Sequence, residues 1–219
     1  LPAPPPPGDL HTLLVRQHIG LPEEWARVWA AEIALALDHL HSFHIIHRDV
    51  KPENVAIGLD GHVKLTDFGS TKHVELLEGE ARPAARPGSL CGTPEYIAPE
   101  VLLGKPYDET VDWWAFGCLV AEIVTGQQPF ASQSGSVQDM VRRILRCEYV
   151  VPTSADISDN FHALVVATLV SEPEYRLGAS YDDGPGGGGV TDVLRHLWFD
   201  GIDLHAIMNK SIPVSRPTA

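Results

Sequence analysis

The sequence predicts a mainly α-helical domain with a small β element, and three patterns support this class. Apolar residues recur at helical spacing over 29–40, and they run almost without a break over 110–125. Two short apolar runs, 55–57 and 63–65, flank a loop with an Asp-Gly pair, which is typical of hairpins. We therefore expect several helices around one core, beside two or three short strands.

The first long helix is expected to begin near Pro22, because proline is tolerated in a first helical turn. Glu23 and Glu24 follow it, and carboxylates are stabilising at the positive end of the helix dipole. Its apolar stripe predicts core packing and comprises Trp29, Ile33, Ala36, Leu37 and Leu40. The second long helix is apolar nearly all round, which indicates burial, and Gly126 is expected to end it.

The remaining segments are shorter. Residues 69–92 are expected to form a long polar connection, because prolines, alanines and glycines interrupt any periodic pattern. Further helices are predicted at 136–147, 158–170 and 190–197. The glycine run within 184–189 predicts a flexible surface insertion.

The 219-residue chain has a formal net charge of −13. This balance argues against binding to nucleic acid or anionic membranes, since phosphate contacts need Lys and Arg, and it suits a basic peptide partner. Cys91, Cys118 and Cys147 are widely separated and odd in number, which favours a reducing intracellular location, cytoplasmic or nuclear. No apolar stretch predicts a membrane span, and no signal peptide is evident. Because the chain does not start with Met, it is expected to be a fragment or a processed chain.

Four short motifs occur in a fixed order along the chain. They are His47-Arg48-Asp49-Val50-Lys51-Pro52-Glu53-Asn54, then Asp67-Phe68-Gly69, then Gly92-Thr93-Pro94-Glu95-Tyr96, and finally Ala98-Pro99-Glu100. Each string is weak alone, but the order and spacing together are specific. On these residues the chain resembles the protein kinase family, and closely its AGC group, over nearly its whole length.

The resemblance implies ATP-dependent phosphoryl transfer to serine or threonine of protein substrates, with ATP and Mg²⁺ as cofactors. Such a transfer needs positioning and charge neutralisation more than covalent help. Asp49 would accept the proton of the substrate hydroxyl, and Lys51 would steady the transferred phosphate. Asn54 and Asp67 would offer hard oxygen ligands to two magnesium ions. Thr93, together with Lys51, favours a serine or threonine substrate over tyrosine.

Four more residues are assigned to binding roles through the same resemblance. Asp9 matches an acid that contacts the ATP ribose. Ala56 stands where relatives have a larger apolar residue under the adenine ring, so adenine binding is expected to be weaker. Glu53 and Glu122 match acids that bind substrate arginines, and an ordinary surface glutamate is an equally good interpretation of each.

The resemblance also assigns a regulatory site. Ser89 lies four residues before Thr93, where AGC-like kinases carry a phosphorylation site in the activation segment. Arg48 and Lys72 would be the cations that meet its phosphate, which brings three strong acceptors. The alternative is an ordinary loop serine, because such loops are rich in serine.

Other matches imply scaffold roles. Asp112 would hydrogen-bond the backbone of the catalytic loop, and Phe68 and His47 would stack in the interior. Glu100 and Arg176 would form a buried ion pair.

The expected organisation is the large lobe of a protein kinase, without the small lobe in this chain. Residues 1–8 would be a Pro-rich hinge remnant or tail, and 9–205 the lobe itself, with catalytic loop 47–54 and activation segment 67–100. Residues 206–219 would start a C-terminal tail.

The chain contains neither the glycine-rich phosphate loop nor the strand lysine of kinases. Alone it is therefore expected to be poorly active or inactive, and to need the missing small lobe or an upstream kinase as a partner. A kinase-derived scaffold or binding module is the alternative function.

Overall fold

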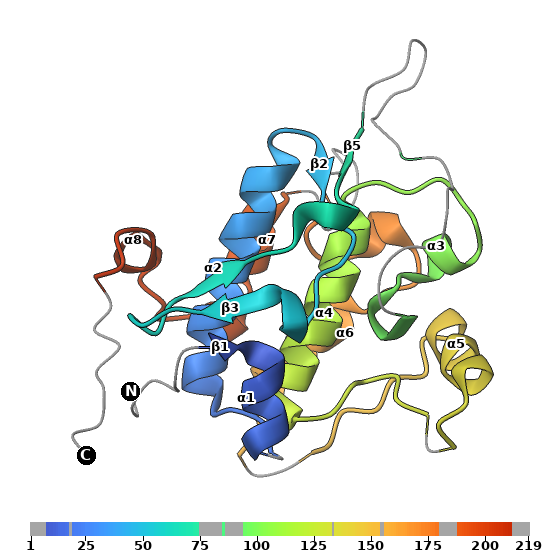
Figure 1. The fold of residues 1–219 in the computed structure, drawn as a ribbon, viewed down its shortest axis with the longest axis horizontal. Coiled ribbons are helices and arrows are strands. Elements are labelled where there is room, and N and C mark those ends of the chain that lie inside the picture. Colours follow the sequence, from blue (N-terminus) through green and yellow to red (C-terminus); the bar gives the residue numbers. More distant parts are fainter. Residues whose placement is uncertain are drawn as a thin grey trace.

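The computed structural model describes residues 8–17, 19–74, 85, 94–132, 134–153, 156–179 and 188–211. It confirms a mostly helical protein with small sheets (Figure 1). Eight α-helices are described: α1 (Leu10–Gln17), α2 (Glu23–His41), α3 (Pro99–Leu102), α4 (Thr110–Thr125), α5 (Val137–Leu145), α6 (Asp159–Thr168), α7 (Val190–Arg195) and α8 (Leu204–Met208).

Two small antiparallel sheets accompany the helices. One has the order β1-β3-β4, formed by Gly8–Asp9, Val55–Ile57 and Val63–Leu65. The other pairs β2 (Ile45–Ile46) with β5 (Lys72–His73). The β3–β4 hairpin has the predicted strand bounds, and its turn is closed by Gly61 with a φ of 80°.

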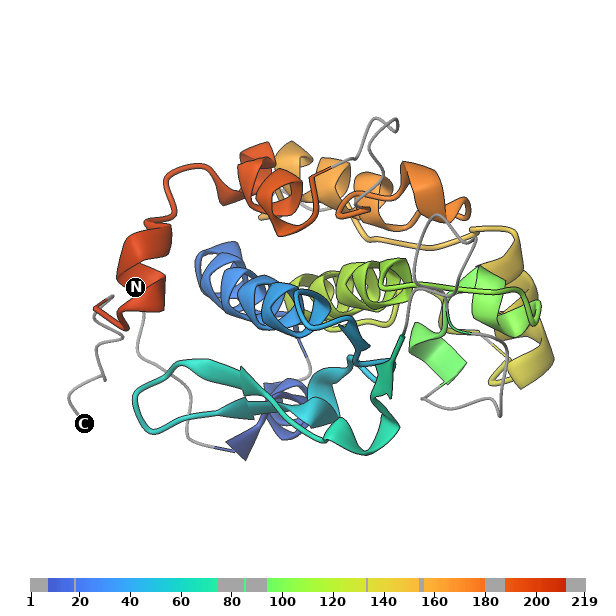
Figure 2. The same cartoon turned by 90° about the horizontal axis from the view of Figure 1, so that it is seen from above.

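Helices α2 and α4 form the centre of the molecule. In Figure 2 they lie between the larger sheet on one side and the later helices α6 and α7 on the other. Every residue of α4 from Thr110 to Val124 is buried, as its continuous apolar sequence predicts. Helix α4 ends at Gly126, whose φ of 71° suits the left-handed cap that glycine adopts at low cost.

The connection between α1 and α2 passes directly over the end of α4. The backbone N–H of Leu21 donates to the carbonyl of Ile123 at 2.7 Å. A Cβ at Gly20 would lie 1.8 Å from the carbonyl oxygen of Val124, so this position has room for glycine alone. The contact fixes α1 relative to α4, and α1 in turn packs against the segment Pro52–Asn54.

The predicted later helices are present as α5, α6 and α7, each ending before the residue expected. Helices α1, α3 and α8 and the β2–β5 sheet were not predicted. In the polar connection, the structure describes residues 69–74 and Ala85, and the rest of it lies outside the described residues. The predicted insertion is likewise described only at Gly188 and Gly189.

Candidate active site

One buried carboxylate holds the loop that precedes β3, because it accepts hydrogen bonds from the backbone of this loop. Asp112, on α4, accepts hydrogen bonds from the backbone N–H of His47 at 2.8 Å and of Arg48 at 2.9 Å. The Nε2 atom of His41 lies 2.8 Å from the same carboxylate, which is fully buried. Arg48 has a φ of 65°, a strained conformation for a side chain of this size. The hydrogen bond that the Arg48 N–H donates to Asp112 fixes this turn, which confirms the predicted role of Asp112.

Asp49 follows this turn and is the centre of a polar cluster. Its Oδ2 atom accepts a hydrogen bond from Nδ2 of Asn54 at 2.8 Å and lies 2.9 Å from Nζ of Lys51. Nδ2 of Asn54 also donates to the backbone carbonyl of Asp49 at 2.7 Å. Because Nδ2 makes both bonds, the acceptor that Asn54 could offer to a cation is Oδ1. The structure therefore brings together three of the predicted catalytic and metal-binding residues.

Asp67 is placed near Asn54 in the chain fold by the strand pairing of the hairpin. The N–H of Thr66 donates to the carbonyl of Asn54 at 2.8 Å, and Asp67 follows with a left-handed φ of 59°. One carboxylate oxygen accepts from the N–H of Gly69 at 3.1 Å, and the side chain is exposed. Asp67 and Asn54 thus leave adjacent points of the two strands.

These two residues fit the chemistry of magnesium. Mg²⁺ is usually held by one or two carboxylates and by phosphate oxygens, rather than by a full protein cage. Among the described residues there is no group of three or more His, Cys, Asp or Glu that could hold a metal ion without such help.

The two residues assigned to ATP lie opposite each other. Asp9 and Ala56 are directly paired across β1 and β3. Asp9 also caps α1, since it accepts bonds from the N–H and the hydroxyl of Thr12 at 2.6 and 2.8 Å. These bonds lower the pKa of Asp9, so the carboxylate is an anion that retains acceptor capacity.

The two glutamates assigned to substrate binding belong to one acidic group. Glu53, half exposed, lies two residues after Lys51, and Glu122 on α4 is buried. Glu122 accepts a hydrogen bond from the hydroxyl of Tyr96. Burial raises the pKa of Glu122; the bond from Tyr96 opposes this shift, and the charge of Glu53 adds to it. Burial and the charge of Glu122 raise the pKa of Tyr96 far above its usual range, so its hydroxyl stays a donor.

Sequence reasoning missed Tyr96 and a second neighbour, His11. The Nδ1 atom of His11 lies 3.7 Å from a carboxylate oxygen of Glu53. Tyr96 is the last residue of the motif Gly92-Thr93-Pro94-Glu95-Tyr96, so this motif could have indicated it. No sequence pattern connects His11, on a different helix, with Glu53.

The two predicted regulatory cations meet at one tyrosine. Arg48 donates from Nη1 to the hydroxyl of Tyr107 at 3.1 Å and from Nε to the carbonyl of Ser70 at 2.6 Å. Nζ of Lys72 lies 5.9 Å from the centre of the Tyr107 ring. Ser89 and Thr93 lie outside the described residues.

Scaffold contacts agree with their assignments. Arg176 forms a two-point pair with Glu100, with N–O distances of 2.8 and 3.1 Å, and both side chains are buried. The rings of His47 and Phe68 meet edge to face, with centres 5.5 Å apart. Phe68 is nevertheless 52% exposed, so this ring is only partly covered by the described residues.

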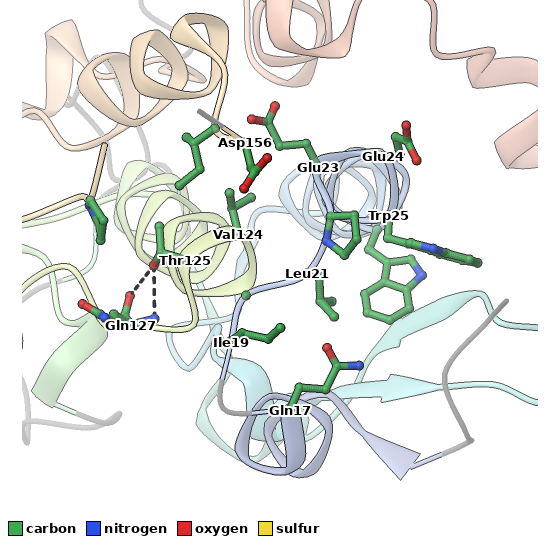
Figure 3. A pocket seen from close by; sticks show the side chains of 15 residues that line it. Gln17, Ile19, Leu21, Glu23, Glu24, Trp25, Val124, Thr125, Gln127 and Asp156 are labelled. Carbon is green, nitrogen blue, oxygen red and sulfur yellow. Dashed lines mark hydrogen bonds between the residues drawn. The ribbon is translucent and has the colours of Figure 1, made fainter. Parts of the chain in front are cut away.

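A pocket of about 1010 Å³ lies apart from this cluster (Figure 3). The end of α1, the start of α2 and the end of α4 line it, and its charged lining residues are Glu23, Glu24 and Asp156. Glu23 is engaged in bonds with Ser158 and Trp198. None of the predicted site residues lines this pocket.

Comparison with known proteins identifies the class to which this geometry belongs. Residues 5–199 match the family described as "Protein kinase domain". The chain therefore belongs to the protein kinase family, and its fold is that of a protein kinase domain in part.

Its similar relatives are serine/threonine kinases of the AGC group. The chain is 40% identical to cAMP-dependent protein kinase catalytic subunit 2 of Drosophila melanogaster over 190 residues, 87% of this chain and 49% of the relative. It is 40% identical to the serine/threonine-protein kinase AtPK2/AtPK19 of Arabidopsis thaliana, covering 88% and 37%. Human ribosomal protein S6 kinase alpha-2 is 38% identical, covering 94% and 26%. The chain thus spans half or less of the length of these relatives. Among the described residues, no helix is long and apolar enough to cross a membrane.

Proposed function

We propose that this chain is the large catalytic lobe of an AGC-like kinase that transfers the γ-phosphoryl group of ATP to serine or threonine of protein substrates. One observation carries the proposal: the carboxylate of Asp49 is held by Asn54 and Lys51 on a loop that buried Asp112 fixes. Phosphoryl transfer depends mainly on such positioning and on charge neutralisation.

Each residue then has a distinct task. Asp49 orients the substrate hydroxyl and accepts its proton, while Lys51, beside it, neutralises charge on the transferred phosphate. Asn54 and Asp67 would hold Mg²⁺, which would supply positive charge to neutralise the phosphates. Asp9 takes the ribose and Ala56 the face of the adenine, consistent with their pairing across the sheet. Thr93 remains a proposal from the motif that contains it.

The proposed substrate class is a basic peptide segment. Glu53 and Glu122 lie close enough for each charge to influence the other, so a guanidinium between them would relieve like-charge repulsion as well as gain hydrogen bonds. Nucleic acid and anionic membranes are not proposed as partners, in view of the net charge of −13.

A peptide-library assay tests both the reaction and this substrate class. In a protein that joins this chain to an ATP-clamping small lobe, we expect phosphorylation of Ser or Thr with enrichment for upstream Arg. Replacing Glu53 by Gln should reduce that enrichment about ten- to a hundredfold, the value of one charge-assisted pair. Glu24→Gln, an exposed glutamate of α2, is the matched control and should leave it unchanged. A library without any preference for upstream Arg would reject the substrate class.

The alternative, a kinase-derived scaffold or binding module, makes a different demand. A scaffold has no need for a small lobe, whereas the partly exposed Phe68 favours a further structural unit that covers this face.

The isolated chain should bind Mg·ATP weakly and transfer no phosphate. An in-frame glycine-rich loop and strand lysine upstream of Leu1 in the gene would decide for the enzyme, and turnover by the isolated chain would show that no partner lobe is needed.

We also propose that phosphorylation of Ser89 regulates the site. Arg48 and Lys72 already converge on Tyr107, and Ala85 pairs with Tyr107 through backbone bonds of 2.6 and 3.1 Å. Ala85, which precedes Ser89 by four residues in the sequence, is thus held at the tyrosine that both cations contact. A phosphate there would replace the neutral hydroxyl of Tyr107 as the partner of Arg48.

Hydrogen exchange of residues 70–95 tests this regulation. Phosphorylation of Ser89 should slow exchange about ten- to a hundredfold, since a charge-assisted pair holds the segment. Arg48→Met should abolish the slowing while Ser89 remains phosphorylated, and Ser89→Ala should lower activity. Equal exchange with and without the phosphate, together with full activity of Ser89→Ala, would show that Ser89 is not the switch.

A further inference from the structure

Helix α1 places a histidine at the edge of the acidic group. Leu10, Leu13 and Leu14 are buried, and the exposed His11 lies on the flank of this buried face. Helix α1 packs against the segment Pro52–Asn54, which contains Glu53 (Figure 1). The imidazole is thereby held 3.7 Å from the Glu53 carboxylate, with about half of each side chain exposed.

The same imidazole also influences the other carboxylates assigned to ligands. Its charge contributes to lowering the pKa of Asp9, after the dominant bonds from Thr12, and opposes the effect of burial on the pKa of Glu122. The charged groups that face His11 are therefore Asp9 on β1, Glu53 on the catalytic loop and Glu122 on α4. On α1 itself the other charged residue is Arg16, in the last turn.

We propose that His11 is a built-in competitor for the arginine-binding carboxylates and makes the preference for basic substrates depend on pH. Protonated His11 pairs with Glu53 and so neutralises part of the negative charge that would attract a substrate arginine. Neutral His11 releases that carboxylate. Histidine is the side chain that ordinarily changes its charge between pH 5 and 8.

The sign follows from the charges. Loss of the His11 proton removes the competing cation, whereas an arginine of the substrate keeps its own charge. Affinity for an arginine peptide should therefore increase with pH. Because the pair is half exposed, the change is about two- to fivefold, as for other solvent-exposed ion pairs. This inference rests on the proposed substrate class.

Glu122 could produce a change of the same sign, because its raised pKa lets it take up a proton as the pH falls. The two causes are separable by substitution. His11→Asn removes the competitor and leaves Glu122 in place, and His11→Lys keeps a permanent cation near Glu53. Glu122→Gln removes the second titrating group and retains His11.

The test measures how tightly the chain binds an acetylated and amidated peptide, Ala-Arg-Arg-Ala-Ser-Ala-Gly, at pH 6 and at pH 8. Fluorescence anisotropy reports the binding. Its control has citrulline, which is neutral, in place of both arginines. For the wild type, we expect the advantage of arginine over citrulline to be about two- to fivefold larger at pH 8. The advantage should be high at both pH values for His11→Asn, low at both for His11→Lys, and still dependent on pH for Glu122→Gln.

Two failures are distinguishable. No advantage of arginine at pH 8 would overturn the substrate class, and the inference with it. An advantage at pH 8 that persists unchanged at pH 6, or that changes with pH equally in His11→Asn, would overturn the role of His11 alone.

Discussion

Replacing Arg176 by Met is expected to destabilise the chain by about 3–5 kcal/mol, because it leaves the carboxylate of Glu100 buried without a counter-ion. Glu100 is 4% and Arg176 0% exposed, so water cannot take over the lost bonds. Arg176 also donates to the backbone carbonyls of Thr110 and Val170, at 2.8 and 3.0 Å, and these acceptors would be left unsatisfied. The measurement is urea unfolding, from which the free energy of unfolding is obtained.

Two further variants show where the loss originates. Arg142→Met makes the same substitution in an exposed ion pair with Asp139, and it should leave the unfolding midpoint almost unchanged. The double variant Arg176→Met with Glu100→Leu should recover part of the stability, because no charge is then buried alone. Arg176→Met that unfolds at the same urea concentration as Arg142→Met would contradict the assignment of Arg176 to a buried pair.

The sequence predicted those elements whose pattern is long or strongly punctuated. Helix α4 has the predicted bounds because an apolar run followed by a glycine leaves few alternatives. Strands β3 and β4 also have the predicted bounds, because the turn between them fixes the register of both. The β2–β5 sheet was missed because a strand of two residues has no measurable periodicity. Helix α1 has buried leucines at helical spacing, but its eight residues follow a proline-rich stretch that suggested a tail.

Prediction of the site divides in a similar way. Asp49, Lys51 and Asn54 are close in sequence, so a loop of fixed shape brings them together and a motif can identify them. The contact of Glu122 with Tyr96 and that of His11 with Glu53 depend on how separate elements pack. Spacing along one chain contains no information about such contacts. The neighbours Tyr96 and His11 are therefore harder to predict here than residues that belong to a single motif.

Replacing Asp49 by Ala is expected to lower the rate of phosphoryl transfer about 10²–10⁴-fold, the usual contribution of a general base. The assay uses this chain together with a small lobe, and it follows kcat and KM for ATP separately. Asp49 bonds to Asn54 and Lys51 within the loop, and no ATP-binding role is proposed for it, so KM should change little while kcat falls.

The controls separate chemistry from folding. Asp38→Ala removes an exposed carboxylate from α2 and should retain full activity. Asp49→Asn preserves the size of the side chain but cannot accept the proton, so it should lose nearly as much activity as Asp49→Ala. Equal melting temperatures of the wild type and both Asp49 variants would show that the loop, held by Asp112, stays folded. If Asp49→Ala retains the wild-type kcat, another group positions the hydroxyl, and the cluster of Asp49, Asn54 and Lys51 serves only to maintain the shape of the loop.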